Sequence, residues 1–392
     1  MTEISPSNRN QGFDMRLLPR FSAAMMATAS NLLLGQSIED GVKAFDAGDF
    51  ETAAEIVETL AYGGNAQAMF YFGALYESGK GVAQDYAEAV RWYRIAAGRG
   101  ISLAQYSLGS MYYTGIGVPK NYERAVKWYR MAAEQGHSEA QYSLGSMYYD
   151  EVGVPQDYAE AAKWYRMAAE QGDSMAQYSL AVIYYNGEGV PQDYERAVKW
   201  LRMAAEQGDS TAQYSLGKMY YNGNSVSQNY ERAVKWYRMA AEQGHVSAQQ
   251  KLGVIYYEGF GVPQDYDQAA EWFRMAAKQF ATAKYYLGVM YRNGDGVFQD
   301  SSMAARWYRL AAAEGNALAQ NDLGLMYENG EGIAQNFRNA YILFNLAAAQ
   351  GNEDARKNRD TVAEKLSPDQ LAEAQRISSE WDLGEPVPLQ GY

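Results

Sequence analysis

Residues 104–136 read AQYSLGSMYYTGIGVPKNYERAVKWYRMAAEQG, and close copies of this stretch recur along most of the chain. The tryptophans mark the period of the copies. They stand 36 residues apart, with a last step of 35 residues, at Trp92, Trp128, Trp164, Trp200, Trp236, Trp272 and Trp307. A fixed period of roughly 20 to 50 residues is typical of a solenoid built from stacked supersecondary units.

Each copy reads as two helices separated by a turn. In the first half, apolar residues recur at the spacing of one helix face: Ala104, Leu108, Met111 and Tyr112. The second half repeats this spacing with Ala125, Tyr129, Ala132 and Ala133. Between the halves, two glycines and a proline would break a continuous helix: Gly115, Gly117 and Pro119. One helix pair cannot bury its apolar stripe alone, so we predict that neighbouring pairs stack.

The ends of these helices carry their own signals. An Asp or Asn precedes every second helix and can cap it, at a gain of about 1 kcal/mol each. These residues are Asp85, Asn121, Asp157, Asp193, Asn229, Asp265, Asp300 and Asn336. A Glu three residues later predicts capping boxes in two copies, Asp85 with Glu88 and Asp157 with Glu160. Gly136 fits a left-handed residue after the second helix, whereas Glu151 and Ser225 replace turn glycines.

The recurring pattern A-Q-Y-x-L-G-x-M-Y, G-x-G-V-P-Q-D-Y and A-x-x-W-Y-x-x-A-A-x-x-G resembles the Sel1-like repeat, a relative of the tetratricopeptide repeat. The resemblance extends from Asn65 to Gly351 and covers eight copies. It implies an all-α fold, a right-handed superhelical α-solenoid of antiparallel helix pairs. Counting the ends, we expect about ten pairs.

The remaining segments flank this array. Residues 37–64 contain a Gly-Asp-Phe turn at 48–50 and predict an N-terminal capping helix pair, since terminal repeats are often atypical. Residues 65–351 hold the eight repeats, the last with Leu343 at the tryptophan position. Residues 352–392 predict C-terminal capping helices and a tail, with Ser367 and Pro368 starting a helix.

Residues 1–36 form a leader with the features of a possible signal peptide. Residues 15–20 are basic, residues 21–34 are mostly apolar, and Ala27-Thr28-Ala29 fits a cleavage site. This order predicts export from a start at Met15 and a periplasmic or secreted protein. Because Ser30 and Asn31 interrupt the apolar run and a start at Met1 adds a polar extension, an uncleaved leader and a cytoplasmic protein are the alternative.

Composition limits the classes of partner and site. The net charge of −13 argues against nucleic acid as the partner, because phosphate binding needs a basic surface. It favours neutral or basic partners. The chain has no cysteine, which excludes disulfides and Cys-ligated metal. No apolar run has the length of a membrane span, so we expect no stable membrane insertion. We expect a monomer.

Several features imitate catalytic or ligand sites. The acidic glycine turns Gly187-Glu188-Gly189, Gly294-Asp295-Gly296 and Gly330-Glu331-Gly332 lack the Lys-Ser/Thr of a phosphate loop and the spaced acids of a calcium loop. We interpret them as turn geometry. His137 and His245 are expected to be exposed at repeat junctions, too far apart to share a metal. No motif singles out a catalytic group, so we predict no enzyme activity, no cofactor and no metal.

Two ladders of aromatic residues are the best candidates for a partner-binding site. By analogy with tetratricopeptide arrays, first helices line a concave groove, where Tyr offers a large, rigid contact area. The first ladder consists of Phe70, Tyr106, Tyr142, Tyr178 and Tyr214, with Tyr285 at the same phase. The second ladder consists of Tyr113, Tyr149, Tyr185, Tyr221 and Tyr257. The alternative is that these rings are core. We expect the tryptophans to be structural and buried.

The sequence therefore predicts a non-enzymatic scaffold or adaptor that binds an unidentified protein or peptide partner in the concave groove. The resemblance permits a role in bacterial envelope regulation or host contact. The alternative is glycan or peptidoglycan binding, because stacked Tyr rings also suit the faces of sugars.

Overall fold

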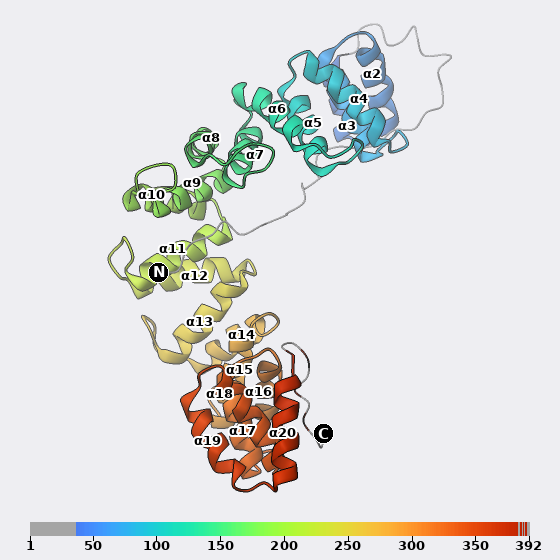
Figure 1. Cartoon of the computed structure of the whole chain (residues 1–392). Helices are drawn as coiled ribbons and strands as arrows, with labels where there is room; N and C mark the ends of the chain where they lie inside the picture. Colours follow the sequence, from blue (N-terminus) through green and yellow to red (C-terminus); the bar gives the residue numbers. More distant parts are fainter. Residues whose placement is uncertain (1–36, 383–384, 386, 388, 390–392) are drawn as a thin grey trace. The chain divides into compact units, whose positions relative to one another are not determined.

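The computed structural model describes residues 37–382, 385, 387 and 389, so the predicted leader lies outside the described residues. The described residues form 20 α-helices and no strand (Figure 1). In order they are α1 (Ile38–Asp46), α2 (Phe50–Tyr62), α3 (Ala66–Ser78), α4 (Tyr86–Gly98), α5 (Ser102–Thr114), α6 (Tyr122–Glu134), α7 (Ser138–Tyr149), α8 (Tyr158–Glu170), α9 (Ser174–Asn186), α10 (Tyr194–Glu206), α11 (Ser210–Asn222), α12 (Tyr230–Glu242), α13 (Val246–Glu258), α14 (Tyr266–Ala276), α15 (Ala281–Asn293), α16 (Ser301–Ala313), α17 (Ala317–Asn329), α18 (Phe337–Ala349), α19 (Glu353–Ala363) and α20 (Pro368–Glu380).

The predicted all-α solenoid of helix pairs is confirmed. The chain divides into two compact units, which we call the amino-terminal unit (α1–α10) and the carboxy-terminal unit (α11–α20). Within each unit, a helix packs chiefly on the helices directly before and after it in the chain. In the carboxy-terminal unit, α18 also packs against both α19 and α20. Buried apolar side chains of successive helices therefore pack into clusters within each unit.

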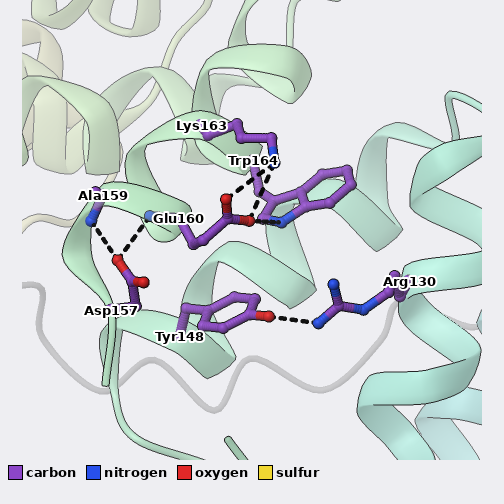
Figure 2. A network of polar contacts seen from close by, with 7 residues as sticks. All are labelled: Arg130, Tyr148, Asp157, Ala159, Glu160, Lys163 and Trp164. Atoms are coloured by element: carbon purple, nitrogen blue, oxygen red, sulfur yellow. Dashed lines mark hydrogen bonds and ion pairs between the residues drawn. The ribbon is translucent and has the colours of Figure 1, made fainter. Parts of the chain in front are cut away.

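The predicted caps of the second helices are all present, because each Asp or Asn accepts a hydrogen bond from a backbone N–H of the first turn. Figure 2 shows this for Asp157, which accepts from the N–H groups of Ala159 and Glu160 at 3.0 Å each. Neither of the two predicted capping boxes forms, and the Glu88 carboxylate accepts from Arg91 at 3.1 Å. The Glu160 carboxylate accepts instead from Lys163 at 2.9 Å and from the Trp164 indole at 3.2 Å.

The first helices are capped as well, which corrects the prediction for the histidines. His137 and His245 are not exposed junction residues. They are the N-caps of α7 and α13, and each ring accepts through Nδ1 from a backbone N–H at 3.3 Å. The His137 side chain is only 9% exposed. The prediction failed because a ring that accepts a cap hydrogen bond lies against its helix rather than in water.

The core of each repeat centres on the residue after the tryptophan. Its ring packs against a glycine of the first helix, so closely that a Cβ on Gly145 would lie 2.8 Å from Cδ1 of Tyr165. The same contact recurs in Gly73–Tyr93, Gly109–Tyr129, Gly217–Tyr237, Gly253–Phe273, Gly288–Tyr308 and Gly324–Phe344. One repeat differs at both positions, with Ala181 and Leu201. The smaller side chain makes room for the extra methyl group.

In five repeats the next residue of the first helix matches the core residue chemically. Tyr129 and Tyr165 have hydroxyls, and these bond the serines Ser110 and Ser146 at 3.1 Å. Where the core residue has no hydroxyl, the serine gives way to an apolar residue: Val182 beside Leu201, Val254 beside Phe273 and Leu325 beside Phe344. In these repeats the pairing avoids a buried polar group without a partner, which is costly. The other repeats do not follow it: Lys218 stands beside Tyr237, whose buried hydroxyl has no hydrogen-bond partner among the described residues.

In five repeats a buried glutamine donates to a backbone carbonyl of the preceding repeat within the same unit. Gln141 donates to the Ala133 carbonyl at 3.0 Å and accepts from Gln171 at 2.7 Å. In one repeat a buried Lys284 paired with Glu314 replaces the two glutamines. Repeats also meet through Arg–Tyr contacts such as that of Arg130 with the Tyr148 hydroxyl (Figure 2). These contacts set the spacing of neighbouring pairs within a unit.

The tryptophans are less buried than predicted. Trp92 and Trp164 are 6% and 5% exposed, but Trp128, Trp200, Trp236, Trp272 and Trp307 are half-buried. The tryptophans are less buried because the side chain that packs on the first-helix glycine is that of the next residue in the chain. The predicted turn geometry is confirmed: Gly136 has φ of +89°. Glu151 and Ser225, which stand where other repeats have glycine, also adopt the left-handed conformation, with φ of +59° and +65°.

Candidate functional site

The first ladder lies partly inside the core. Phe70 is buried, at 7% exposure, and the tyrosines Tyr106, Tyr142, Tyr178 and Tyr214 are half-buried. Their rings pack on the core tyrosine of the same repeat: Tyr106 on Tyr129, Tyr142 on Tyr165 and Tyr214 on Tyr237, each with ring centroids 5.6 Å apart. These residues support the fold with one side and leave the other side accessible.

Two rings of the first ladder also stack on the histidine that caps the first helix of the next pair. Tyr106 lies 4.8 Å from the His137 ring and Tyr214 lies 4.6 Å from the His245 ring, nearly parallel in both cases. Burial lowers the pKa of His137, although the nearby Glu139 carboxylate opposes this shift. The neutral ring is the form that can accept the cap hydrogen bond.

The second ladder is more open but also has a structural role. Tyr113 is 36% exposed, and Tyr149, Tyr185, Tyr221 and Tyr257 are half-buried. Each ring meets a tyrosine at the start of the second helix of its repeat, with centroids 5.0–5.3 Å apart. These partners are Tyr122, Tyr158, Tyr194, Tyr230 and Tyr266. In these five repeats the ring at this phase therefore packs beside the turn between the two helices.

The acidic glycine turns have a role that sequence reasoning missed. The Tyr149 hydroxyl donates to Glu188 of the next repeat at 2.8 Å, and Tyr257 donates to Asp295 at 3.2 Å. Burial and this carboxylate raise the pKa of Tyr257 to about 12. In a later repeat, Arg292 replaces the tyrosine and binds Glu331 through two hydrogen bonds of 3.0 and 2.8 Å. The recurrence of an acid between the two turn glycines was the available signal.

The structure thus brings the two ladders together on the first helices of each unit, over α3, α5, α7 and α9 in one and over α11, α13 and α15 in the other. Within the described residues, no group of three or more His, Cys, Asp or Glu side chains could hold a metal ion. No helix in the described part of the chain is long and apolar enough to cross a membrane. The surface offers ring edges, hydroxyls and carboxylates, which suit binding of another molecule.

Comparison with known proteins identifies the repeat. The model of the Sel1 repeat family matches eight consecutive segments: residues 66–101, 102–137, 138–173, 174–209, 210–245, 246–279, 281–316 and 317–352. Together these segments cover more than half of the chain. No curated protein matches the chain.

A solved structure supports the same family. The crystal structure of a Sel1 repeat protein from Oxalobacter formigenes is 38% identical, covers 62% of this chain and 100% of that chain, and has a TM-score of 0.56. A protective antigen present in uropathogenic Escherichia coli strains, which displays an SLR fold, is 31% identical. That match covers 90% of this chain and 92% of the antigen, with a TM-score of 0.42.

Proposed function

The chain belongs to the Sel1 repeat family, and we propose that it is a non-enzymatic scaffold that binds a protein or peptide on the face formed by its first helices. Sel1 repeat proteins are commonly scaffolds for protein–protein interactions and are generally non-catalytic. The binding residues in this proposal are the two aromatic ladders defined above.

The observation that carries the proposal is the second ladder. Its tyrosines recur in consecutive first helices at one phase, they are the more open of the two sets, and two of their hydroxyls are held by turn carboxylates. A ring fixed in this way loses little conformational freedom when a partner binds, which is how Tyr becomes a strong interface residue. Successive repeats in the amino-terminal unit would present such a surface to one partner.

Site-specific photo-crosslinking tests the proposal. A photoreactive phenylalanine derivative placed at Tyr113, which is 36% exposed on α5, should capture a protein partner from the native host. The matched control is Met131 on α6, which is 42% exposed on a second helix and should capture nothing specific. Equal capture at both positions, or at Met131 alone, would refute the first-helix face as the binding surface.

Glycan or peptidoglycan binding is the second candidate, and the ring geometry supports it less well. Sugars stack on open, flat aromatic faces, whereas Tyr149 meets Tyr158 at 62° and Tyr185 meets Tyr194 at 63°. Each edge-to-face contact covers part of a face that a sugar would need. Sedimentation of the protein with insoluble peptidoglycan would favour this candidate over the protein scaffold.

The cellular role of the scaffold is also a proposal. We propose that the protein is exported to the periplasm or secreted and acts there as a monomer, in envelope regulation or host contact. The support for export is the basic and then apolar order of residues 15–34. Sedimentation velocity of the mature protein tests the monomer, and fractionation of the native cells tests export.

A further inference from the structure

We infer that the first-helix face of the amino-terminal unit binds a basic segment of its partner, a stretch of polypeptide that carries Lys or Arg side chains. By this face we mean the exposed sides of α3, α5, α7 and α9 together with the caps Asp150 and Asp173. The inference rests on the proposed function and adds the chemical class of the partner.

Charge is divided unevenly between the two kinds of helix. The first helices α3, α5, α7 and α9 contain no Lys or Arg at all, whereas the second helices α4, α6, α8 and α10 each contain at least two. The turns that follow α3 and α5 carry Lys80 and Lys120, and the Lys120 ammonium group lies over the Tyr122 ring, 4.7 Å from the centroid. The charged side chains that the first helices present are therefore carboxylates only.

Four carboxylates of this face lack a basic partner: Glu77, Glu139, Asp150 and Asp173. Within the part of the chain that the structure describes, no Lys or Arg nitrogen lies within 4.0 Å of them. Glu139 lies 3.3 Å from His137, but burial lowers the pKa of that ring and so favours its neutral form. No Lys or Arg of the described residues therefore pairs with the carboxylates of this face.

The surroundings make this charge unfavourable in the free protein. Burial raises the pKa of Glu77, Asp150 and Asp173, and the Glu139 carboxylate contributes to the shift at Asp173. Burial withdraws water from these carboxylates, and a nearby cation would stabilise their charged form in its place. Complementary charge of this kind speeds association and selects against wrong partners.

The carboxy-terminal unit shows the opposite arrangement. Its first helices contain Lys218, Lys251, Lys284 and Arg292. Carboxylates there have partners from the same chain: Glu331 binds Arg292 at 2.8 Å, Glu328 binds Lys365 at 2.7 Å and Glu314 binds Lys284. The same repeat can thus pair carboxylates of its first helices and turns with bases of the same chain, whereas the four carboxylates named above have no such partner.

The tyrosine rings complete the recognition of a cation. A Lys or Arg side chain gains from lying over an aromatic face while its charge pairs with a carboxylate. The protein already uses this contact internally, with Arg124 over the Tyr112 ring at 5.5 Å. On the open face, Tyr142 and Tyr149 belong to α7, the helix that Asp150 ends. Glu139, Asp150 and Asp173 all lie on or beside α7, so the basic residues of an extended segment would meet carboxylates and tyrosine rings together at this helix.

Fluorescence anisotropy with three labelled peptides tests the inference on the full chain. The probes are a Lys-Ala repeat, a Glu-Ala repeat and a Ser-Gly repeat of equal length. We expect only the Lys-Ala probe to bind, and its affinity to fall steeply as salt screens the charges. The variant Glu139→Gln with Asp150→Asn should weaken this binding about tenfold or more, as removal of interface charges does.

A second variant separates a local site from net charge. Glu123→Gln with Glu195→Gln also removes two charges, from exposed positions on α6 and α10, and should weaken binding less than about twofold. Circular dichroism and melting curves of both variants should match the parent. Equal weakening by the two variants would overturn the inference. So would crosslinking at Tyr113 to a partner whose contact segment lacks basic residues, and that outcome would leave the proposed function intact.

Discussion

The contact between Gly145 and Tyr165 predicts that the effect of Gly145→Ala on stability depends on whether the tyrosine ring is present. A Cβ on Gly145 would lie 2.8 and 2.9 Å from Cδ1 and Cε1 of Tyr165, well inside the ordinary carbon–carbon separation of about 3.5–4.0 Å. Overpacking of this kind costs about 1–3 kcal/mol. Replacing a helical glycine by alanine returns about 1 kcal/mol through helix propensity. We therefore expect Gly145→Ala to destabilise the protein by about 1 kcal/mol.

The sign should reverse when Tyr165 is first replaced by Leu. Tyr165→Leu alone should cost about 2–3 kcal/mol, because it shrinks a buried side chain and removes the 3.1 Å hydrogen bond to Ser146. With the ring gone, the alanine Cβ has room and only the gain in helix propensity remains. In that background Gly145→Ala should stabilise by up to about 1 kcal/mol. The repeat with Ala181 and Leu201 already has this combination.

Urea unfolding followed by circular dichroism measures the four free energies, and amide hydrogen exchange of α7 and α8 reports the local effect. Gly98→Ala in α4 is the control, since a Cβ there would meet nothing within 4 Å and should only stabilise. Adding Ser146→Val to the double variant should restore further stability. If Gly145→Ala changed stability equally in the parent chain and in the Tyr165→Leu variant, the packing argument would be refuted.

Four further outcomes are expected. Glu151→Gly should raise stability by about 0.5–1 kcal/mol in urea unfolding, because Glu151 has φ of +59°, and an unchanged midpoint would contradict this. Trp164→Ala should cost about 3–5 kcal/mol, more than Trp307→Ala, because Trp164 is only 5% exposed; melting curves decide it. Burial raises the pKa of Asp173 above its usual value of 3.8, so the folded state binds the proton more tightly than the unfolded chain does. The folded state therefore loses stability as pH rises from about 3.8 through the raised pKa. Asp173→Asn keeps the cap and should melt higher than the parent at neutral pH, with no difference below about pH 3.8. Mass spectrometry of the native protein should show residues before about 36 removed, and an intact N-terminus would contradict export.

Helix pairs, turns and second-helix caps could be predicted from the sequence because they depend on residues close together in the chain. Asp157 caps the residues that directly follow it, and Gly136 adopts its positive φ within its own turn. Because the same capping and turn residues recur every 36 residues, the prediction for one copy is supported by the others. The same reasoning failed for His137, the cap of α7, whose stacking partner Tyr106 lies two helices earlier on α5.

The sequence by itself determined an all-α array of stacked helix pairs and located its tyrosine ladders. Only the tertiary structure decided which rings are core: Tyr165 fills the space beside Gly145, and Tyr149 reaches Glu188 in the next repeat. It also showed which carboxylates find a cation from the same chain and which, such as Asp150, do not. The physical reason is the distance along the sequence between the residues that interact. Caps and turns are settled within a few residues, whereas burial and charge pairing depend on side chains that stacking brings together from different repeats.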